Sequence, residues 1–191
     1  MARFHSPWRG AAWALLVTGA LMGCSESKPP DRLVVGQDFP AVTMSSIDGK
    51  EVSLSAYRGK LVVLNVWATW CPPCREELPS LQRLSRLLDD KRFVIVGLSL
   101  DQDNIAVREY LRDRGVTYTN YLDRGLQIVK HVLGMKAYPD TFLIGADGRF
   151  LGRVVGAIEW DNPQIVQVLE AAYNGDSEGL RNLPRGSYGS S

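Results

Sequence analysis

Two largely apolar runs, at residues 60–68 and 92–100, are the strongest features in the pattern of hydrophobic and polar positions along the chain. Each run has the length of one strand, and its near-continuous apolar character is typical of a central strand that is buried on both faces. Shorter runs on either side of two Asp-Gly turns, in residues 41–54 and 140–156, predict two β-hairpins.

Apolar residues recur every three or four positions in four other segments, which therefore predict helices. These segments are residues 72–90, 101–115, 126–134 and 161–173. Asp103 and Asn162 are expected to cap the start of the second and the last of these helices. Gly115 and Gly134 are expected to end the second and the third. Pro79 lies inside the first helix and is expected to kink it.

The order of the predicted elements is a hairpin, a strand, a helix, a strand, two helices, two strands and a last helix. Strand–helix–strand units need a partly parallel sheet with right-handed crossovers. The last two strands would add an antiparallel pair to this sheet. We therefore expect an α/β fold in which a mixed central sheet is flanked by helices on both faces.

Residues 1–23 have the pattern of an export signal. Arg3 and Arg9 precede an apolar run of 12 residues, 11–22, which is shorter than the roughly 20 residues that a transmembrane helix needs. The run leads into Leu-Met-Gly-Cys, which resembles the lipobox of bacterial lipoproteins, in which the cysteine is lipidated. We expect Cys24 to carry a lipid anchor; a free or buried cysteine, or ordinary secretory cleavage nearby, is the alternative.

Composition changes again at two later points. Residues 24–35 are polar and contain two prolines, which predicts a linker between the lipid and the domain. Residues 36–173 have the pattern of one globular domain. Residues 174–191 are rich in glycine and serine and have no periodicity, which predicts a flexible tail.

Charge excludes one class of function. The chain has 22 lysines and arginines against 21 acidic residues, a formal net charge of +1 and no basic patch. Nucleic-acid binding therefore has no electrostatic support. If Cys24 is lipidated, the odd cysteine is explained, and Cys71 and Cys74 remain as a pair in a compartment where disulfides persist.

This cysteine pair carries the main chemical signal. Cys71 follows a buried strand and precedes a helix, whose partial positive charge and free N–H groups favour a thiolate. Pro72 and Pro73 have no N–H to offer that sulfur, so its thiolate should be less stabilised than with two ordinary residues. A less stabilised thiolate makes a less oxidising couple, which predicts a reducing protein.

Other roles for the pair have less support. A structural bridge across so short a loop contributes little to stability. Zinc needs two further ligands, and the only histidines are His5 and His131, with no second Cys-x-x-C. We expect no metal and no cofactor. Copper binding that involves His131 stays open as part of a metallochaperone role, although a solvated position on a helix is the simpler interpretation of this residue.

The segments NVWATWCPPCREELPSL and YPDTFLIGADGRFLGRVVG together resemble the thioredoxin superfamily over residues 36–173. Within it, the resemblance is to the membrane-tethered TlpA/ResA-like thiol–disulfide oxidoreductases, which include the cytochrome c maturation reductases. It implies a thioredoxin-like fold with an N-terminal β-hairpin extension. It also implies that Cys71 is the exposed nucleophile, that Cys74 resolves the mixed disulfide, and that Pro139 is a cis-proline facing them.

The resemblance also assigns an acid. Thioredoxin has a buried acid six residues before its first cysteine, where this chain has Asn65, which cannot titrate. TlpA/ResA-like relatives carry an acid on the active-site helix, and Glu77 matches that position. Glu77 lies three residues after Cys74 and so on the same flank of the helix. We expect it to exchange a proton with a thiol; the alternative is a solvated glutamate beside Glu76. Asp140 is the second candidate.

Several neighbours of the cysteines are expected to form a docking surface for substrate proteins. They are Trp70, Pro72, Pro73, Tyr138 and Asp140. Trp67 is expected in the core. Residues 36–60 also resemble the start of peroxiredoxins, but Ala68 and Leu64 replace the threonine and proline of the peroxide-reducing motif, so peroxidase activity is not expected.

The sequence thus predicts a lipid-anchored, extracytoplasmic (periplasmic) enzyme that reduces protein disulfides, apocytochrome c being the first client to test. A membrane electron donor of the thiol-transporting type would restore its dithiol. Two alternatives stay open: an oxidase that introduces disulfides, and a non-enzymatic thioredoxin-fold metallochaperone or assembly factor. Which membrane holds the lipid does not follow from the sequence.

Overall fold

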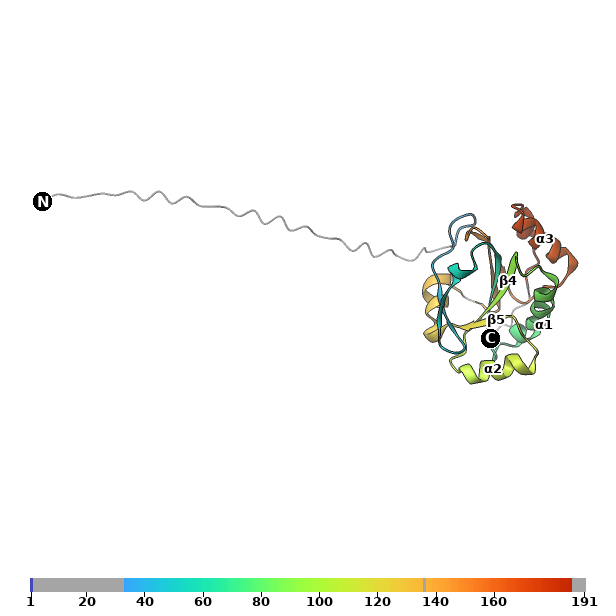
Figure 1. Ribbon diagram of the computed structural model, residues 1–191, viewed down its shortest axis with the longest axis horizontal. Helices are drawn as coiled ribbons and strands as arrows, with labels where there is room; N and C mark the ends of the chain where they lie inside the picture. Colours follow the sequence, from blue (N-terminus) through green and yellow to red (C-terminus); the bar gives the residue numbers. More distant parts are fainter. Residues whose placement is uncertain (2–32, 136, 187–191) are drawn as a thin grey trace.

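A computed structural model gives the fold of the chain and describes Met1 and residues 33–135 and 137–186 (Figure 1). The predicted export signal, the lipidation site Cys24 and most of the predicted linker lie outside the described residues. No helix in the described part is long and apolar enough to cross a membrane.

The described residues form a mixed sheet of seven strands in the order β2-β1-β5-β4-β3-β6-β7. The strands are β1 (Thr43–Ser46), β2 (Glu51–Ser53), β3 (Leu61–Trp67), β4 (Phe93–Ser99), β5 (Thr119–Leu122), β6 (Asp140–Ile144) and β7 (Phe150–Val155). Strands β3, β4 and β5 are parallel, and every other pairing is antiparallel. The predicted N-terminal hairpin is β1–β2, and the predicted C-terminal pair is β6–β7.

The α-helices of the described part are α1 (Pro72–Leu87), α2 (Asn104–Asp113) and α3 (Pro163–Tyr173). Their predicted caps are confirmed. The Asp103 carboxylate accepts the N–H of Ile105 at 2.8 Å, and the Asn162 side chain accepts that of Gln164 at 2.9 Å. Helix α1 continues through Pro79, whose side chain is exposed.

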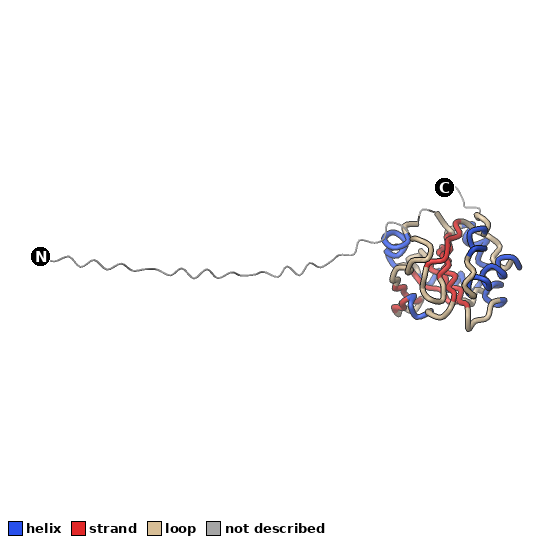
Figure 2. Tube along the Cα trace, turned by 90° about the horizontal axis from the view of Figure 1, so that it is seen from above, coloured by secondary structure: helices blue, strands red, loops and turns tan. Residues whose placement is uncertain are grey.

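Helices cover both faces of the sheet, as predicted (Figures 1 and 2). Helices α1, α2 and α3 lie on one face. Trp67 of β3 points to this face, where its ring contacts Tyr110 of α2 with centroids 5.7 Å apart. The segment that holds the 3-10 helix η2 (Arg124–Leu126) and the π-helix η3 (Val129–Leu133) lies on the opposite face.

The core is built around β3, because all seven of its residues are buried. This confirms the expectation of a central strand covered on both sides, and it confirms the core position of Trp67, which donates its indole N–H to Asn120 at 2.9 Å. Since β3 runs parallel to β4 and antiparallel to β6, its carboxyl end meets the beginning of β6. The cysteine pair follows this end of β3.

Three elements differ from the predictions. Strand β5 was not predicted, because its residues TNYL form no apolar run and are held by β4 and β1 on either side. The helix predicted at 126–134 is a 3-10 turn followed by a π-helix, although Gly134 does end it with φ 58°. The flexible tail predicted at 174–191 is wrong for its described part, because Glu178–Asn182 form the 3-10 helix η4 and Leu180 is buried.

Candidate active site at the start of helix α1

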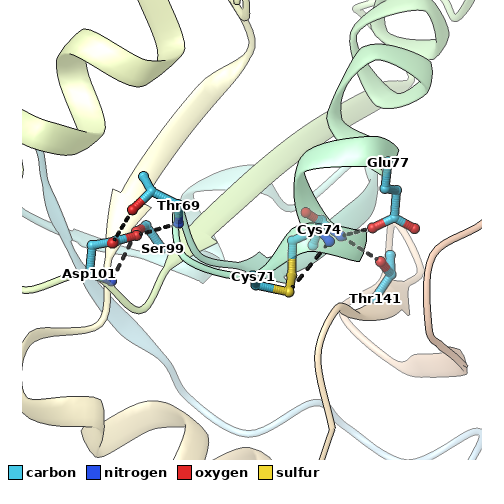
Figure 3. Close-up of a disulfide and its surroundings, with 8 residues drawn as sticks. Thr69, Cys71, Cys74, Glu77, Ser99, Asp101 and Thr141 are labelled. Atoms are coloured by element: carbon cyan, nitrogen blue, oxygen red, sulfur yellow. Dashed lines mark hydrogen bonds between the residues drawn. A yellow bond between two sulfur atoms is a disulfide. The ribbon is translucent and has the colours of Figure 1, made fainter. Parts of the chain in front are cut away.

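Cys71 and Cys74 form a disulfide at the start of α1 (Figure 3). Cys71 is the N-cap residue, as expected for a cysteine between a strand and a helix. The side chains differ in access to solvent: Cys71 keeps 5% of its surface exposed and Cys74 none. The expected order of accessibility therefore holds, but Cys71 is far less exposed than predicted, because the disulfide turns its sulfur toward the helix.

Backbone donors around the Cys71 sulfur are few. Pro72 and Pro73 occupy the first two helical positions and have no N–H. The N–H of Cys74 is the one that points at the Cys71 sulfur, at 3.4 Å. The first turn of α1 thus has the shortage of donors that the two prolines predicted.

A buried carboxylate, Asp101, holds the loop that leads into Cys71. It accepts the backbone N–H of Thr69 at 2.9 Å, the hydroxyl of Thr69 at 2.6 Å and the hydroxyl of Ser99 at 2.8 Å. Figure 3 shows this group on one side of the disulfide, with Glu77 on the other. Asp101 was not predicted from the sequence as a residue of the site. Its position directly after a buried strand parallel to β3 is the signal that could have indicated it.

The peptide bond between Tyr138 and Pro139 is cis, as the resemblance implied. Asp140, the next residue, pairs with Val66 near the end of β3, so Pro139 lies at the same edge of the sheet as the cysteine loop. The ring of Tyr138 meets that of Trp70 edge to face, with centroids 6.1 Å apart. Two of the predicted docking residues are therefore in contact, and Trp70 is 60% exposed.

Glu77 is buried, in contrast to its exposed neighbour Glu76, because it lies on the inner flank of α1 and keeps only 2% of its surface. Its oxygen Oε1 accepts the indole N–H of Trp160 at 2.6 Å and the backbone N–H of Ile158 at 3.2 Å. Its oxygen Oε2 accepts the side-chain N–H of Asn65 at 2.8 Å. The alternative of a solvated surface glutamate is therefore wrong.

Burial raises the pKa of Glu77 from 4.5 to about 7. The hydrogen bonds from Trp160, Ile158 and Asn65 act in the opposite direction, because an N–H donor favours the charged carboxylate. The charge of Asp140 adds a smaller increase. A carboxyl group with this pKa can both accept and release a proton near neutral pH, which suits general acid–base chemistry.

Asn65 links Glu77 to β6. Its side-chain nitrogen donates to Glu77 and also to the hydroxyl of Thr141 at 2.9 Å. Its buried carbonyl oxygen has no hydrogen-bond partner among the described residues. Asn65 therefore does not replace the buried acid of thioredoxin; instead it holds the acid that α1 provides.

Asp140, the second acid candidate, is fully buried and is held by Arg153 of β7, whose Nε lies 2.8 Å from both carboxylate oxygens. Burial raises the pKa of Asp140, and the Arg153 guanidinium opposes this increase. Because its charge is matched by a fixed partner, Asp140 is placed as half of an ion pair, whereas Glu77 has neutral partners only. The prediction that Asp140 belongs to the docking surface is wrong, because its side chain is fully buried against Arg153. The structure therefore favours Glu77 as the group that exchanges protons.

The described residues offer no ready metal site. His131 is exposed on the π-helix of the opposite face, and no three His, Cys, Asp or Glu side chains of the described part are grouped to hold an ion.

The sequence matches the Redoxin family over residues 34–169. It is 30% identical over 140 residues to the thiol-disulfide oxidoreductase ResA of Bacillus thuringiensis subsp. konkukian (strain 97-27), which covers 73% of this chain and 79% of that protein. It is 31% identical over 123 residues to ResA of Bacillus subtilis (strain 168), with 64% and 68% covered.

Solved structures agree with these sequence relatives. A Chlorobium tepidum protein assigned as the thiol:disulfide interchange protein DsbE has a TM-score of 0.67 and 29% identity, over 74% of this chain and 99% of that one. A thioredoxin family thiol:disulfide interchange protein from Chlorobium tepidum TLS has a TM-score of 0.61 and 27% identity, over 70% and 95%. With its Cys71–Cys74 pair, this chain belongs to the Redoxin family, as a ResA-like thiol–disulfide oxidoreductase of the thioredoxin superfamily.

Proposed function

We propose that this enzyme works outside the cytoplasm as a reductase of protein disulfides. The observation that supports this direction is the first turn of α1, where the Cys71 sulfur receives, among the described residues, a single backbone N–H, from Cys74. With few donors the thiolate of the reduced form is weakly stabilised, so the dithiol gives up its electrons readily.

The reaction begins when the Cys71 thiolate attacks one sulfur of a client disulfide. The client S–S bond breaks, one client thiolate leaves, and Cys71 becomes joined to the client. Cys74 then loses its proton, attacks the Cys71 sulfur and releases the second client thiolate. The client gains two electrons, and the enzyme is left with the Cys71–Cys74 disulfide seen in the structure.

Glu77 is the base in the second half of this reaction. Cys74 has no exposed surface, so bulk water does not reach its thiol to take the proton. The Glu77 carboxylate is one helical turn away, and its pKa of about 7 allows it to accept a proton from a thiol and release it later. When an external dithiol reduces the enzyme again, Glu77 returns the proton to Cys74.

The partners follow from the chemistry and the N-terminal sequence. The lipobox-like pattern supports a lipid on Cys24 and an extracytoplasmic location. A compartment without a thiol buffer requires a membrane donor to supply electrons. Clients are proteins with accessible disulfides, and apocytochrome c, with its Cys-x-x-Cys-His sites, is the first to test.

The direction of electron transfer is tested by measuring the redox equilibrium between the enzyme and glutathione. We expect a reduction potential well below the roughly −120 mV of a strong dithiol oxidant. Pro73→Ala adds one N–H beside the Cys71 sulfur, which should favour the reduced form about tenfold. Pro79→Ala, which changes an exposed proline of the same helix, should leave the equilibrium unchanged. A wild-type potential near that of a strong oxidant would refute the proposed direction.

Clients are identified with Cys74→Ser, which removes the resolving thiol and leaves Cys71 joined to its partner. We expect mixed disulfides that mass spectrometry can identify after non-reducing separation. Cys71→Ser with Cys74 intact is the control and should trap far less, because Cys74 is fully buried.

A further inference from the structure

The loop between β7 and α3, residues 156–162, is held on α1 by polar contacts along one face of the helix. Glu77, Ser80 and Arg83 are three residues apart and therefore share that face. Glu77 accepts two N–H groups from the loop. The Ser80 hydroxyl donates to a loop carbonyl at 3.3 Å and accepts the backbone N–H of Trp160 at 3.1 Å. Arg83 pairs with two acids of the loop at the surface.

The two oxygens of Glu77 therefore have different surroundings. Oε1 accepts hydrogen bonds from both loop donors, Trp160 at 2.6 Å and Ile158 at 3.2 Å, and these two bonds occupy both of its lone pairs. Oε2 accepts one donor from the described part of the chain, Asn65 at 2.8 Å, which leaves one of its lone pairs without a partner there. Asn65 in turn contacts Thr141, and Figure 3 shows Thr141 and Glu77 on the same side of the disulfide, the side of Cys74.

We propose that Trp160 is a positioning residue for the acid–base group: its buried indole N–H fixes Oε1 of Glu77 on the loop side and leaves Oε2 to exchange the proton on the side of Cys74. This inference rests on the proposed role of Glu77. Trp160 is completely buried, and its ring and backbone are both held, so the indole N–H keeps one direction. Residues 157–160 of this loop lie between the predicted hairpin and the predicted last helix, and the sequence indicated no role for Trp160.

The physical consequence is a change in proton affinity. A hydrogen bond from a neutral N–H to a carboxylate stabilises the charged form only. Removing the indole donor should therefore raise the proton affinity of Glu77 about tenfold, the usual effect of one such bond to a charged group. Other ionisable groups face Glu77 as well: Asp140 of β6 with its partner Arg153, and Tyr118 before β5. All of them remain when Trp160 is changed.

The test is a carbon-13 NMR titration of the Glu77 carboxyl in the oxidised full-length protein. In Trp160→Phe, which keeps an aromatic ring but has no N–H, we expect the midpoint to move to higher pH. Ser80→Ala is the matched control, because it loosens the same loop and removes no donor from the Glu77 carboxylate; the Ser80 hydroxyl donates to the backbone carbonyl of Glu77 instead. An unchanged midpoint in Trp160→Phe, or an equal shift in Ser80→Ala, would overturn the assignment.

A second measurement does not depend on whether a Trp160 variant folds, because Trp160 stays unchanged in it. In the wild-type protein, the indole N–H resonance of Trp160 should titrate with the Glu77 carboxyl, with a midpoint near pH 7, and it should lose this transition in Glu77→Gln. An indole resonance that does not follow Glu77 would contradict the inference.

The role of Glu77 as the base and the positioning role of Trp160 can be refuted independently of each other. If Trp160→Phe shifts the Glu77 titration while the pH dependence of disulfide reduction stays where it was, Trp160 positions the carboxyl but Glu77 is not the base. If Glu77→Gln removes the pH dependence of turnover near pH 7 while Trp160→Phe leaves the carboxyl titration unchanged, Glu77 is the base and Trp160 is structural.

Discussion

The buried carboxyl of Glu77 makes the stability of the oxidised protein depend on pH, and Glu77→Gln should remove that dependence. Burial raises the pKa of this group from 4.5 to about 7. Between these values the folded protein holds a proton that the unfolded chain has released. The free energy of unfolding therefore falls as the pH rises through this window and becomes level above it.

The magnitude follows from the width of the window. At about 1.4 kcal/mol for each pH unit, the interval from 4.5 to about 7 corresponds to a loss of roughly 3 kcal/mol. Glutamine is neutral at every pH and has no such loss. Burial also raises the pKa of Asp140, but Asp140 is present in both proteins, so only its coupling to Glu77, the smallest cause of the Glu77 shift, remains in the difference between them.

The assay is urea unfolding of the oxidised protein at pH 5 and pH 8. Wild type should lose between about 2 and 3 kcal/mol from the lower to the higher pH. Glu77→Gln should lose much less, even if its altered hydrogen bonds make it less stable at both. Glu76→Gln, the exposed neighbour, should behave like wild type. If Glu77→Gln loses as much stability between the two pH values as wild type does, the buried carboxyl does not titrate as described.

Three further changes test other parts of the site. Asp101→Asn should destabilise the protein by about 2 kcal/mol and slow the attack on client disulfides, and a double-mutant cycle with Thr69→Ala should show strong coupling in urea unfolding. Arg153→Ala leaves Asp140 buried without its partner and should cost about 3 kcal/mol, much of it recovered when Asp140→Asn is added. Trp70→Ala should raise the KM for a protein disulfide and leave the reduction of a small disulfide unchanged, because this exposed ring is available only to a partner with an extended surface.

Much of the fold could be predicted because its signals are local. The buried runs of β3 and β4, the caps at Asp103 and Asn162 and the position of Cys71 at a helix start each depend on a few neighbouring residues. Such short-range preferences act before the chain is packed, so the sequence alone displays them.

The missed elements depend on distant partners. Strand β5 has four residues without an apolar run, and it is a strand because β4 and β1 supply hydrogen bonds on both sides. Leu180 is a single apolar residue in a segment without periodicity, and it is buried because η4 packs on α3 and β7. No local pattern distinguishes these segments from loops.

The same distinction separates the two halves of the candidate site. The cysteines, their prolines and the cis-proline form one half, and each was visible as a motif within a few residues of sequence. The other half consists of Asp101, which holds the loop before Cys71, and Trp160, which holds Glu77. Both act through polar contacts that span more than 30 positions of the chain, and nothing around them in the sequence is periodic or repeated.

Glu76 and Glu77 show why this second half decides the chemistry. The two residues have the same side chain and adjacent positions on one helix, yet one is exposed and the other has a pKa of about 7. A rotation of about 100° around the helix axis separates them, and it points Glu77 at the loop of residues 156–162. Because that loop excludes water and supplies two N–H donors, it both raises the pKa by burial and limits the increase by hydrogen bonding. The proton affinity of Glu77 is therefore governed from a loop about 85 residues further along the chain, and with Glu77 as the proposed base, substitutions there should change the pH dependence of the enzyme without touching either cysteine.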